Sequence, residues 1–255
     1  MDLANEGDET TSLVGAYDEY YQMGVRSLME KENIKKVPNK YILSEAERPN
    51  YNLEINNTNL INLPVIDFAQ LQASNRSLVI NSLAKACQDY GFFQLVNHGI
   101  KGDVIDRMKD ASKRFFELPS SERSKYMSND MCSPVRYGTS FNQNNDKVYC
   151  WRDFLKLSCH PALSQNFPHH WPSSPLDLSE EGSQIVVMNW YPACPEPELT
   201  LGMPPHSDYG LLTLLLQDEQ VEGLQIQHQG TWLNLKPIPN SFVVNVGDHL
   251  EVSSC

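Results

Sequence analysis

From residue 184 onward the chain is a succession of short apolar runs, separated at close intervals by Gly, Pro, Asn and Gln. Runs of this length between such breakers are typical of β-strands, and several in a row indicate an antiparallel sandwich or barrel. This pattern constrains the fold more than any other feature, because it commits the second half to β-sheet. The runs are QIVVMNWY (184–191), LLTLLLQ (211–217), GLQIQH (223–228), TWLNLKP (231–237) and SFVVNVG (241–247).

The first half mixes helix and strand patterns. Two short apolar segments, 63–68 and 92–97, are typical of buried strands. Gly91 suits the position just after a helix, and Pro119 stops a helical pattern. Residues 31–62 are rich in Asn, Lys and Pro and predict an extended connector. Together with the β-rich second half, these patterns predict an α+β fold. The helical segments are Leu13–Glu30, Asn75–Tyr90 and Asp103–Leu118.

Charge and cysteine content exclude several classes of function. The 255 residues carry a formal net charge of −12 and no block of Lys and Arg, so the chain repels phosphate backbones and anionic membranes. No run approaches the roughly 18 apolar residues of a membrane span. The acidic start, MDLANEGDET, is unlike a signal or transit peptide. Six cysteines without a C-x-x-C pair are typical of reduced thiols, so we expect a cytoplasmic protein that binds neither nucleic acid nor membrane.

The segment PPHSDYG, residues 204–210, places His206 and Asp208 in a turn between two strand patterns. A histidine and a carboxylate one residue apart can supply two corners of a 2-His-1-carboxylate metal site. The spacing alone is weak, since His249-Leu250-Glu251 shares it. The turn adds weight, because flanking strands would hold both side chains in place. From these residues alone, a metal site and an ordinary polar turn remain equal alternatives.

No other histidine has the spacing of a further metal ligand. His98 follows a strand pattern and is interpreted as a capping or core histidine, while His169 and His170 precede WP in a loop. His228 falls at the exposed tip of a predicted hairpin. The chain also lacks a Ser/His/Asp order, a P-loop and a G-x-G-x-x-G motif, which excludes the common hydrolase and nucleotide-binding classes.

The long segment from NWYPACPEPELTLGMPPHSDYG to SFVVNVGDHLEV resembles the catalytic core of plant Fe(II)/2-oxoglutarate-dependent dioxygenases, a group that includes flavanone 3-hydroxylase, flavonol synthase and gibberellin oxidases. The motifs LPVIDF, ACQDYGFFQLVNHGI and FFELPSSER are similar to the N-terminal domain of the same family. The resemblance implies an N-terminal α/β region followed by a double-stranded β-helix, or jelly roll. The expected segments are 1–62, a helix and connector; 63–180, the dioxygenase N-terminal domain; and 184–255, the jelly-roll domain.

The resemblance also implies roles for individual residues. His206 and Asp208 would be two of three iron ligands, and Tyr191 with Asn189 would bind 2-oxoglutarate. Three further positions would line the substrate pocket: Tyr137, Val187 and Ser207. Three protein ligands on one face of Fe(II) leave positions for the keto acid and O₂. The resemblance implies hydroxylation or desaturation of a small plant metabolite such as a flavonoid, with ascorbate as reductant, by a monomer.

The sequence departs from the family pattern in two places. The family has a long helical segment before the N-x-Y-P strand, whereas only a few residues separate Leu178 from Gln184 here. The family's distal histidine and Arg-x-Ser lie beyond GDHLEV, where this chain reads SSC. His249 sits at the strand end that precedes that ligand, so it is expected to remain a turn histidine. These departures predict an incomplete jelly roll and impaired turnover; the alternative is an inactive isoform that binds a small molecule or a protein.

Overall fold

The computed structural model describes residues 23–32, 34–48, 60–140, 145–158, 185–219 and 221–253. The chain forms two compact units, each built from two separate stretches of sequence. Residues 1–51 and 106–204 form the first unit, and residues 52–105 and 205–255 form the second. The expected helix over 13–30 is described only from residue 23, and the expectations for His169, His170 and the segment 178–184 lie outside the described residues.

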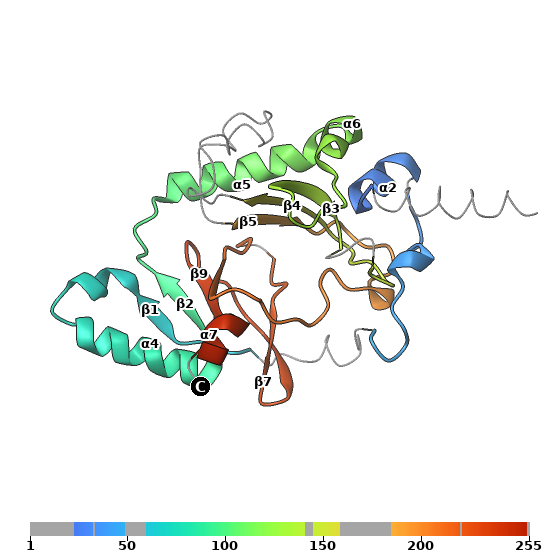
Figure 1. Cartoon of the computed structure of the whole chain (residues 1–255). Helices are drawn as coiled ribbons and strands as arrows, with labels where there is room; N and C mark the ends of the chain where they lie inside the picture. Colours follow the sequence, from blue (N-terminus) through green and yellow to red (C-terminus); the bar gives the residue numbers. More distant parts are fainter. Residues whose placement is uncertain are drawn as a thin grey trace, which may run out of the picture. The chain divides into compact units, whose positions relative to one another are not determined.

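The first unit is a three-stranded antiparallel sheet with a helix on one face (Figure 1). Its strands, in the order β3-β4-β5, are Val135–Thr139, Asp153–Ser158 and Ile185–Trp190. Helix α5, Gly102–Glu117, belongs to this unit from Asp106 on and ends two residues before Pro119, as predicted. The helix and the sheet bury a common apolar cluster: Ala111, Phe115, Phe116, Val135, Tyr137, Leu155, Leu157 and Met188.

Short helices complete the first unit. They are α2, Val25–Glu32; α6, Ser120–Arg123; and the 3-10 turns η1, Asn39–Tyr41, η3, Ser124–Tyr126, and η6, Pro197–Leu199. The predicted connector 31–62 therefore contains a helical turn, η1, because Tyr41 is fully buried there against Tyr149 and Trp151.

The second unit contains a four-stranded sheet in the order β1-β2-β9-β6. Its strands are Val65–Asp67, Phe92–Val96, Phe242–Val246 and Leu212–Leu215, and only the β1–β2 pair is parallel. Strands from the first and second halves of the sequence thus share one sheet. Helix α4, Arg76–Tyr90, connects β1 to β2 after the 3-10 turn η2, Phe68–Gln72, and packs on one face of the sheet (Figure 1). Gly91 ends α4 with a φ of 67°, which confirms the predicted cap.

A hairpin and a short helix finish the second unit. Strands β7, Gln225–His228, and β8, Thr231–Asn234, are joined by Gln229 and Gly230, both with positive φ, as a tight two-residue hairpin requires. His228 is half-buried because its ring stacks on Tyr90 at a centroid distance of 5.0 Å, so the expected exposed tip is wrong for this side chain. Helix α7, Asp248–Ser253, follows β9 and was not predicted.

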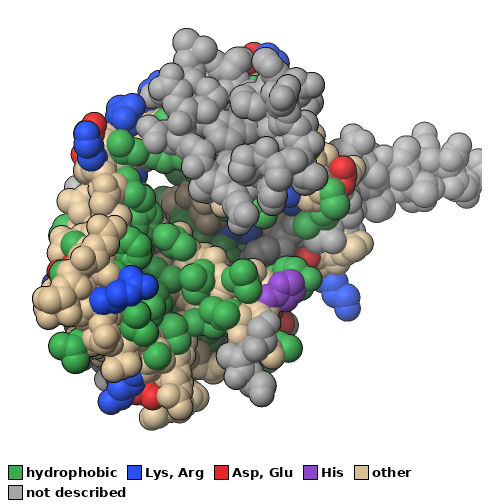
Figure 2. Space-filling model, turned by 60° about the vertical axis from the view of Figure 1, so that its left-hand side comes forward, with side chains coloured by type: hydrophobic (Ala, Val, Ile, Leu, Met, Phe, Trp, Pro, Cys, Tyr) green, Lys and Arg blue, Asp and Glu red, His purple; other side chains and the backbone are tan. Residues whose placement is uncertain are grey.

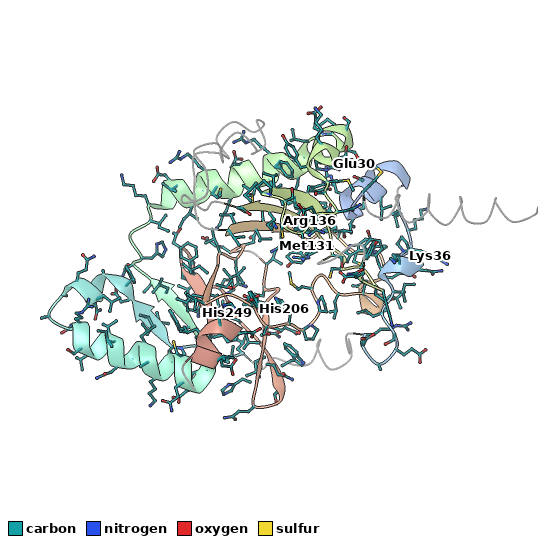
Figure 3. The ribbon with its side chains drawn as sticks, viewed as in Figure 1. Glu30, Lys36, Met131, Arg136, His206 and His249 are labelled. Carbon is teal, nitrogen blue, oxygen red and sulfur yellow. The ribbon has the colours of Figure 1, made fainter. Side chains whose placement is uncertain are left out.

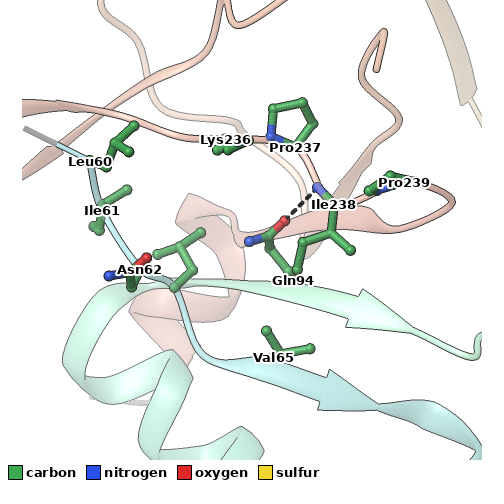
Figure 4. A pocket seen from close by; sticks show the side chains of 10 residues that line it. Leu60, Ile61, Asn62, Val65, Gln94, Lys236, Pro237, Ile238 and Pro239 are labelled. Carbon is green, nitrogen blue, oxygen red and sulfur yellow. Dashed lines mark hydrogen bonds between the residues drawn. The ribbon is translucent and has the colours of Figure 1, made fainter. Parts of the chain in front are cut away.

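The face of the four-stranded sheet opposite α4 carries a groove of about 410 Å³ (Figure 4). Leu60, Ile61 and Val65 give it apolar walls. The nearly buried Gln94 accepts a hydrogen bond from the Ile238 N–H at 3.3 Å and so ties β2 to the segment before β9. Large apolar side chains also lie at the surface of this unit near β6, and Figure 2 shows hydrophobic side chains gathered on one face of the molecule. The described residues include no helix long and apolar enough to cross a membrane.

Candidate metal centre

The loop that carries His206 and Asp208 is fixed to the end of strand β9 by main-chain hydrogen bonds. The Asp248 N–H donates to the Asp208 carbonyl at 2.8 Å, and the Gly247 N–H donates to the Leu211 carbonyl at 2.9 Å. A Cβ at Gly247 would overlap the carbonyl oxygen of Gly210, so only glycine permits this approach. Main-chain hydrogen bonds therefore hold the loop against the end of the sheet independently of its side chains.

His206 and Asp208 converge on one point. The Nε2 atom of His206 lies 3.4 Å from Oδ1 of Asp208, and both side chains remain partly exposed, at 41% and 30%. Two ligand atoms bound at right angles to one ion at about 2.1 Å would be about 3.0 Å apart. A carboxylate oxygen and an imidazole nitrogen that releases its proton to the solvent would, at this separation, fit adjacent positions on one Fe(II) ion.

The remaining carboxylate oxygen of Asp208 is held from the sheet. The side-chain amide of Asn245 donates to Oδ2 at 2.9 Å, and Thr213 also donates to this carboxylate. The hydrogen bond from His206 is the main cause that holds the pKa of Asp208 well below its usual range, and those from Thr213 and Asn245 add to it. The Asp208 side chain is therefore a fully ionised carboxylate at neutral pH.

Thr213 and Asn245 were missed from sequence, and the structure shows why they matter. They are directly opposite each other in the β6–β9 ladder, so they occupy one face of the sheet. The available signal was weak: a single hydroxyl and a single amide inside the apolar runs LLTLLLQ and FVVNVG. Their shared target becomes visible only with the strand register.

The other candidates near this loop have different partners. The Ser207 hydroxyl donates to Oδ2 of Asp248 at 3.1 Å. His249 lies in α7, beside the loop of His206 (Figure 3), and its ring packs on Tyr209 at a centroid distance of 4.1 Å. Within the part of the chain that the structure describes, no three His, Cys, Asp or Glu side chains form a metal-binding group.

His98 is a capping histidine, as predicted. Its Nδ1 accepts a hydrogen bond from the Ile100 N–H at 3.2 Å, so the proton resides on Nε2, which donates to the Asn240 carbonyl at 3.0 Å. Both ring nitrogens are thus used to fix the loop after β2.

In the first unit, β5 carries Val187 and Asn189 on the sheet face opposite the buried cluster. Their ladder partners are Lys156 and Phe154. The Asn189 amide oxygen accepts a hydrogen bond from Nη1 of Arg152, a buried arginine that sequence reasoning missed. Tyr191 follows β5 and is half-exposed.

Tyr137 lies on the other face of this sheet and is 1% exposed. Its hydroxyl donates to Oδ2 of Asp153 at 2.7 Å and accepts from Nε of Arg123 at 3.3 Å. The described contacts of Tyr137 are therefore with the core, and not with an open surface.

A histidine and a carboxylate that converge at the end of a sheet, in an α+β chain, would supply two of the three ligands of the 2-His-1-carboxylate site of non-haem iron oxygenases. Residues 63–174 match the family profile described as non-haem dioxygenase in morphine synthesis N-terminal, and residues 182–255 match the 2OG-Fe(II) oxygenase superfamily. The chain belongs to the plant family of Fe(II)- and 2-oxoglutarate-dependent dioxygenases.

Similarity to individual members of this family supports the same assignment. The chain is 37% identical to Protein DMR6-LIKE OXYGENASE 1 of Arabidopsis thaliana, over 86% of this chain and 71% of the relative. It is 35% identical to Flavanone 3-dioxygenase 2 of Oryza sativa subsp. japonica, over 86% and 72%. The crystal structure of JOX2 with 2OG, Fe and JA superimposes with a TM-score of 0.74 at 29% identity, covering 90% of this chain and 74% of that chain. The α+β fold and the Fe(II) and 2-oxoglutarate cofactors predicted from sequence are thereby confirmed.

Proposed function

We propose that His206 and Asp208 bind the Fe(II) ion with which this chain oxidises a small plant metabolite. The observation that carries the proposal is the 3.4 Å separation of His206 Nε2 and Asp208 Oδ1. When bound, Fe(II) with 2-oxoglutarate supplies the oxidising chemistry of the family. The chain contributes a neutral nitrogen ligand and an anionic oxygen ligand, on a loop that the sheet immobilises.

We further propose the remaining roles residue by residue. Tyr191 and Asn189 bind 2-oxoglutarate, with Asn189 oriented by its hydrogen bond from Arg152. Val187 and Ser207 are the positions assigned to the substrate pocket. Tyr137, the third position that the resemblance suggests, contacts the core of the first unit through Asp153 and Arg123. Segments 63–180 and 184–255 are the N-terminal and catalytic parts of a monomeric, cytoplasmic enzyme.

For the substrate we propose a flavonoid or a similar aromatic metabolite. The support is the 35% identity to a relative named Flavanone 3-dioxygenase 2. The test incubates the chain with Fe(II), ascorbate, 2-oxoglutarate and the flavanone naringenin, and measures succinate together with a product heavier by one oxygen or lighter by two hydrogens. Succinate released without any change in naringenin would retain the reaction class and reject this substrate.

A second candidate is a binder without turnover. The observation that favours it is that the described residues bring together two candidate ligands, and not three. Equilibrium dialysis against Mn(II) separates the candidates: metal bound by the chain but lost in His206→Ala, with no succinate, supports the binder. No metal bound by the unaltered chain would reject the ligand assignment for both candidates.

A further inference from the structure

The side chains of Thr213 and Asn245 form a cross-strand pair under the carboxylate of Asp208. We propose that this pair is a positioning device that restricts Asp208 to binding the metal through Oδ1 alone. The inference rests on the proposed metal site, and it assigns a role to two residues outside the ligand set.

The two carboxylate oxygens of Asp208 have different neighbours. Oδ2 accepts the amide hydrogen of Asn245 at 2.9 Å, whereas Oδ1 lies 3.4 Å from Nε2 of His206. Rotating the carboxylate to bring both oxygens to the ion would break the hydrogen bond that holds Oδ2 at Asn245, so binding through Oδ1 alone is favoured. One oxygen of Asp208 therefore faces the histidine, and the other faces the sheet.

Single-oxygen binding has a consequence for the reaction. A six-coordinate ion with three protein ligand atoms keeps three positions for the co-substrates. A second oxygen from Asp208 would occupy one of those positions. The Asn245 amide on Oδ2 thus protects the open coordination sites, and Thr213 adds a second donor to the same carboxylate. Such supporting residues are typically worth 10-fold to 100-fold in metal affinity or activity.

The strand arrangement makes the device rigid. β9 has a strand on each side, because Asn245 pairs with Phe92 of β2 and with Thr213 of β6. The chain just beyond β9 also holds the main chain of Asp208, through the Asp248 N–H. The side chain and the backbone of Asp208 are consequently both fixed by the β9 end of the sheet, which leaves little freedom for the carboxylate.

The test measures Mn(II) affinity of the chain by electron paramagnetic resonance of the free ion. Asn245→Leu should weaken Mn(II) binding about tenfold or more. Thr213→Val, which replaces the hydroxyl with a methyl group, should weaken it severalfold, and Thr213→Ser should restore it. Asn234→Leu is the matched control, because the Asn234 side chain accepts a hydrogen bond from Gln225 at 3.0 Å, away from Asp208. Its affinity should stay within about twofold of the unaltered chain.

Melting curves without metal accompany each titration, so a general loss of structure is recognised. Unchanged affinity in both folded Asn245→Leu and Thr213→Val, with binding abolished in His206→Ala, would overturn the positioning role while leaving the metal site intact. An equal loss in Asn234→Leu would also overturn it. Binding that survives His206→Ala, or no binding by the unaltered chain, would instead reject the metal site and the inference with it.

Discussion

Asp153 carries a carboxylate with no solvent exposure and hydrogen-bond donors from three residues. The Val25 N–H donates to Oδ1 at 2.6 Å, and the Arg26 N–H and the Tyr137 hydroxyl donate to Oδ2 at 3.1 and 2.7 Å. Burial nevertheless raises the pKa of Asp153 from 3.8 to about 6, since desolvation of the charged form outweighs the donors. The first unit therefore contains a group that titrates near physiological pH.

We expect this group to give the chain a specific pH dependence of stability. The folded pKa is higher than the unfolded one, so the stabilisation is fully present below about pH 4 and is lost as the pH rises through about 6. The shift from 3.8 to about 6 corresponds to about 3 kcal/mol of unfolding free energy. Urea denaturation from pH 4.5 to 7.5 should show the unaltered chain losing stability relative to Asp153→Asn. Parallel profiles for the two proteins would contradict the assignment.

A residue of the site could be predicted from the sequence when it lies close along the chain to the residue that it contacts. His206 and Asp208 are one residue apart in a turn, so their convergence is visible in the sequence. Asn245 reaches Asp208 from 37 positions away, and only the β6–β9 register places it there. Arg152 reaches Asn189 in the same way, across the β4–β5 pair. Supporting residues of this kind require tertiary structure.

Among the elements, helix α2 depends on partners at both of its ends. Asp153 accepts its first N–H groups, and Glu30 near its other end pairs with the fully buried Arg123 at 3.0 Å. Arg123 also donates to the main-chain carbonyls of Phe116 and Leu118. These polar contacts, and not intrinsic propensity, explain how an eight-residue helix persists.

Removing the guanidinium should therefore release α2. Arg123→Met is expected to lower the unfolding free energy by about 3 kcal/mol, because two main-chain carbonyls lose a buried donor and Glu30 keeps only Arg26 as its arginine partner. The matched control is Arg114→Met on α5, whose arginine pairs with Asp110 at 2.8 Å but at the surface. That change should cost less than about 1 kcal/mol. Equal losses in urea denaturation would show that burial of Arg123 contributes nothing.

The end of helix α4 offers a test of backbone conformation alone. Gly91 has a φ of 67° and open space around the position of a Cβ, so Gly91→Ala should cost about 1–2 kcal/mol through backbone strain. Gly223 has equally open space and no positive φ, which makes Gly223→Ala the matched control, neutral or slightly stabilising. Thermal unfolding measures both. A neutral Gly91→Ala would mean that the left-handed cap is not needed to end the helix.

Elements with a clear period or a clear breaker were predictable, and the others were not. Helix α4 was predicted over 75–90 and runs from Arg76 to Tyr90, because a regular stripe and Gly91 define it. Strands β3 and β4 were missed although Val135, Tyr137, Leu155 and Leu157 of both form one apolar face. Their other face carries charged side chains and a glycine, which obscures the alternation of a strand.

At the scale of the whole molecule, the net charge restricts which ligands the chain can bind. The net charge of −12 disfavours anionic polymers and favours cations as ligands. A metal ion and a dicarboxylate bound together would meet this requirement, since the cation offsets the charge of its ligand. Cooperative binding of the two should therefore be visible in the stability of the complete chain.

We expect Mn(II) and N-oxalylglycine, an unreactive analogue of 2-oxoglutarate, to stabilise the chain together by more than the sum of their separate effects. A ligand that binds only the folded state at 100 times its Kd adds about 2.7 kcal/mol to the unfolding free energy. For a chain of this size that corresponds to a rise of about 5–10 °C in Tm. Calorimetry with each component, and with both, measures the effect. His206→Ala should remove the metal-dependent part, because the analogue then lacks the ion to which it binds. An identical rise in Tm for His206→Ala would place the ion elsewhere in the molecule, and additive effects of the two components would show that they bind independently.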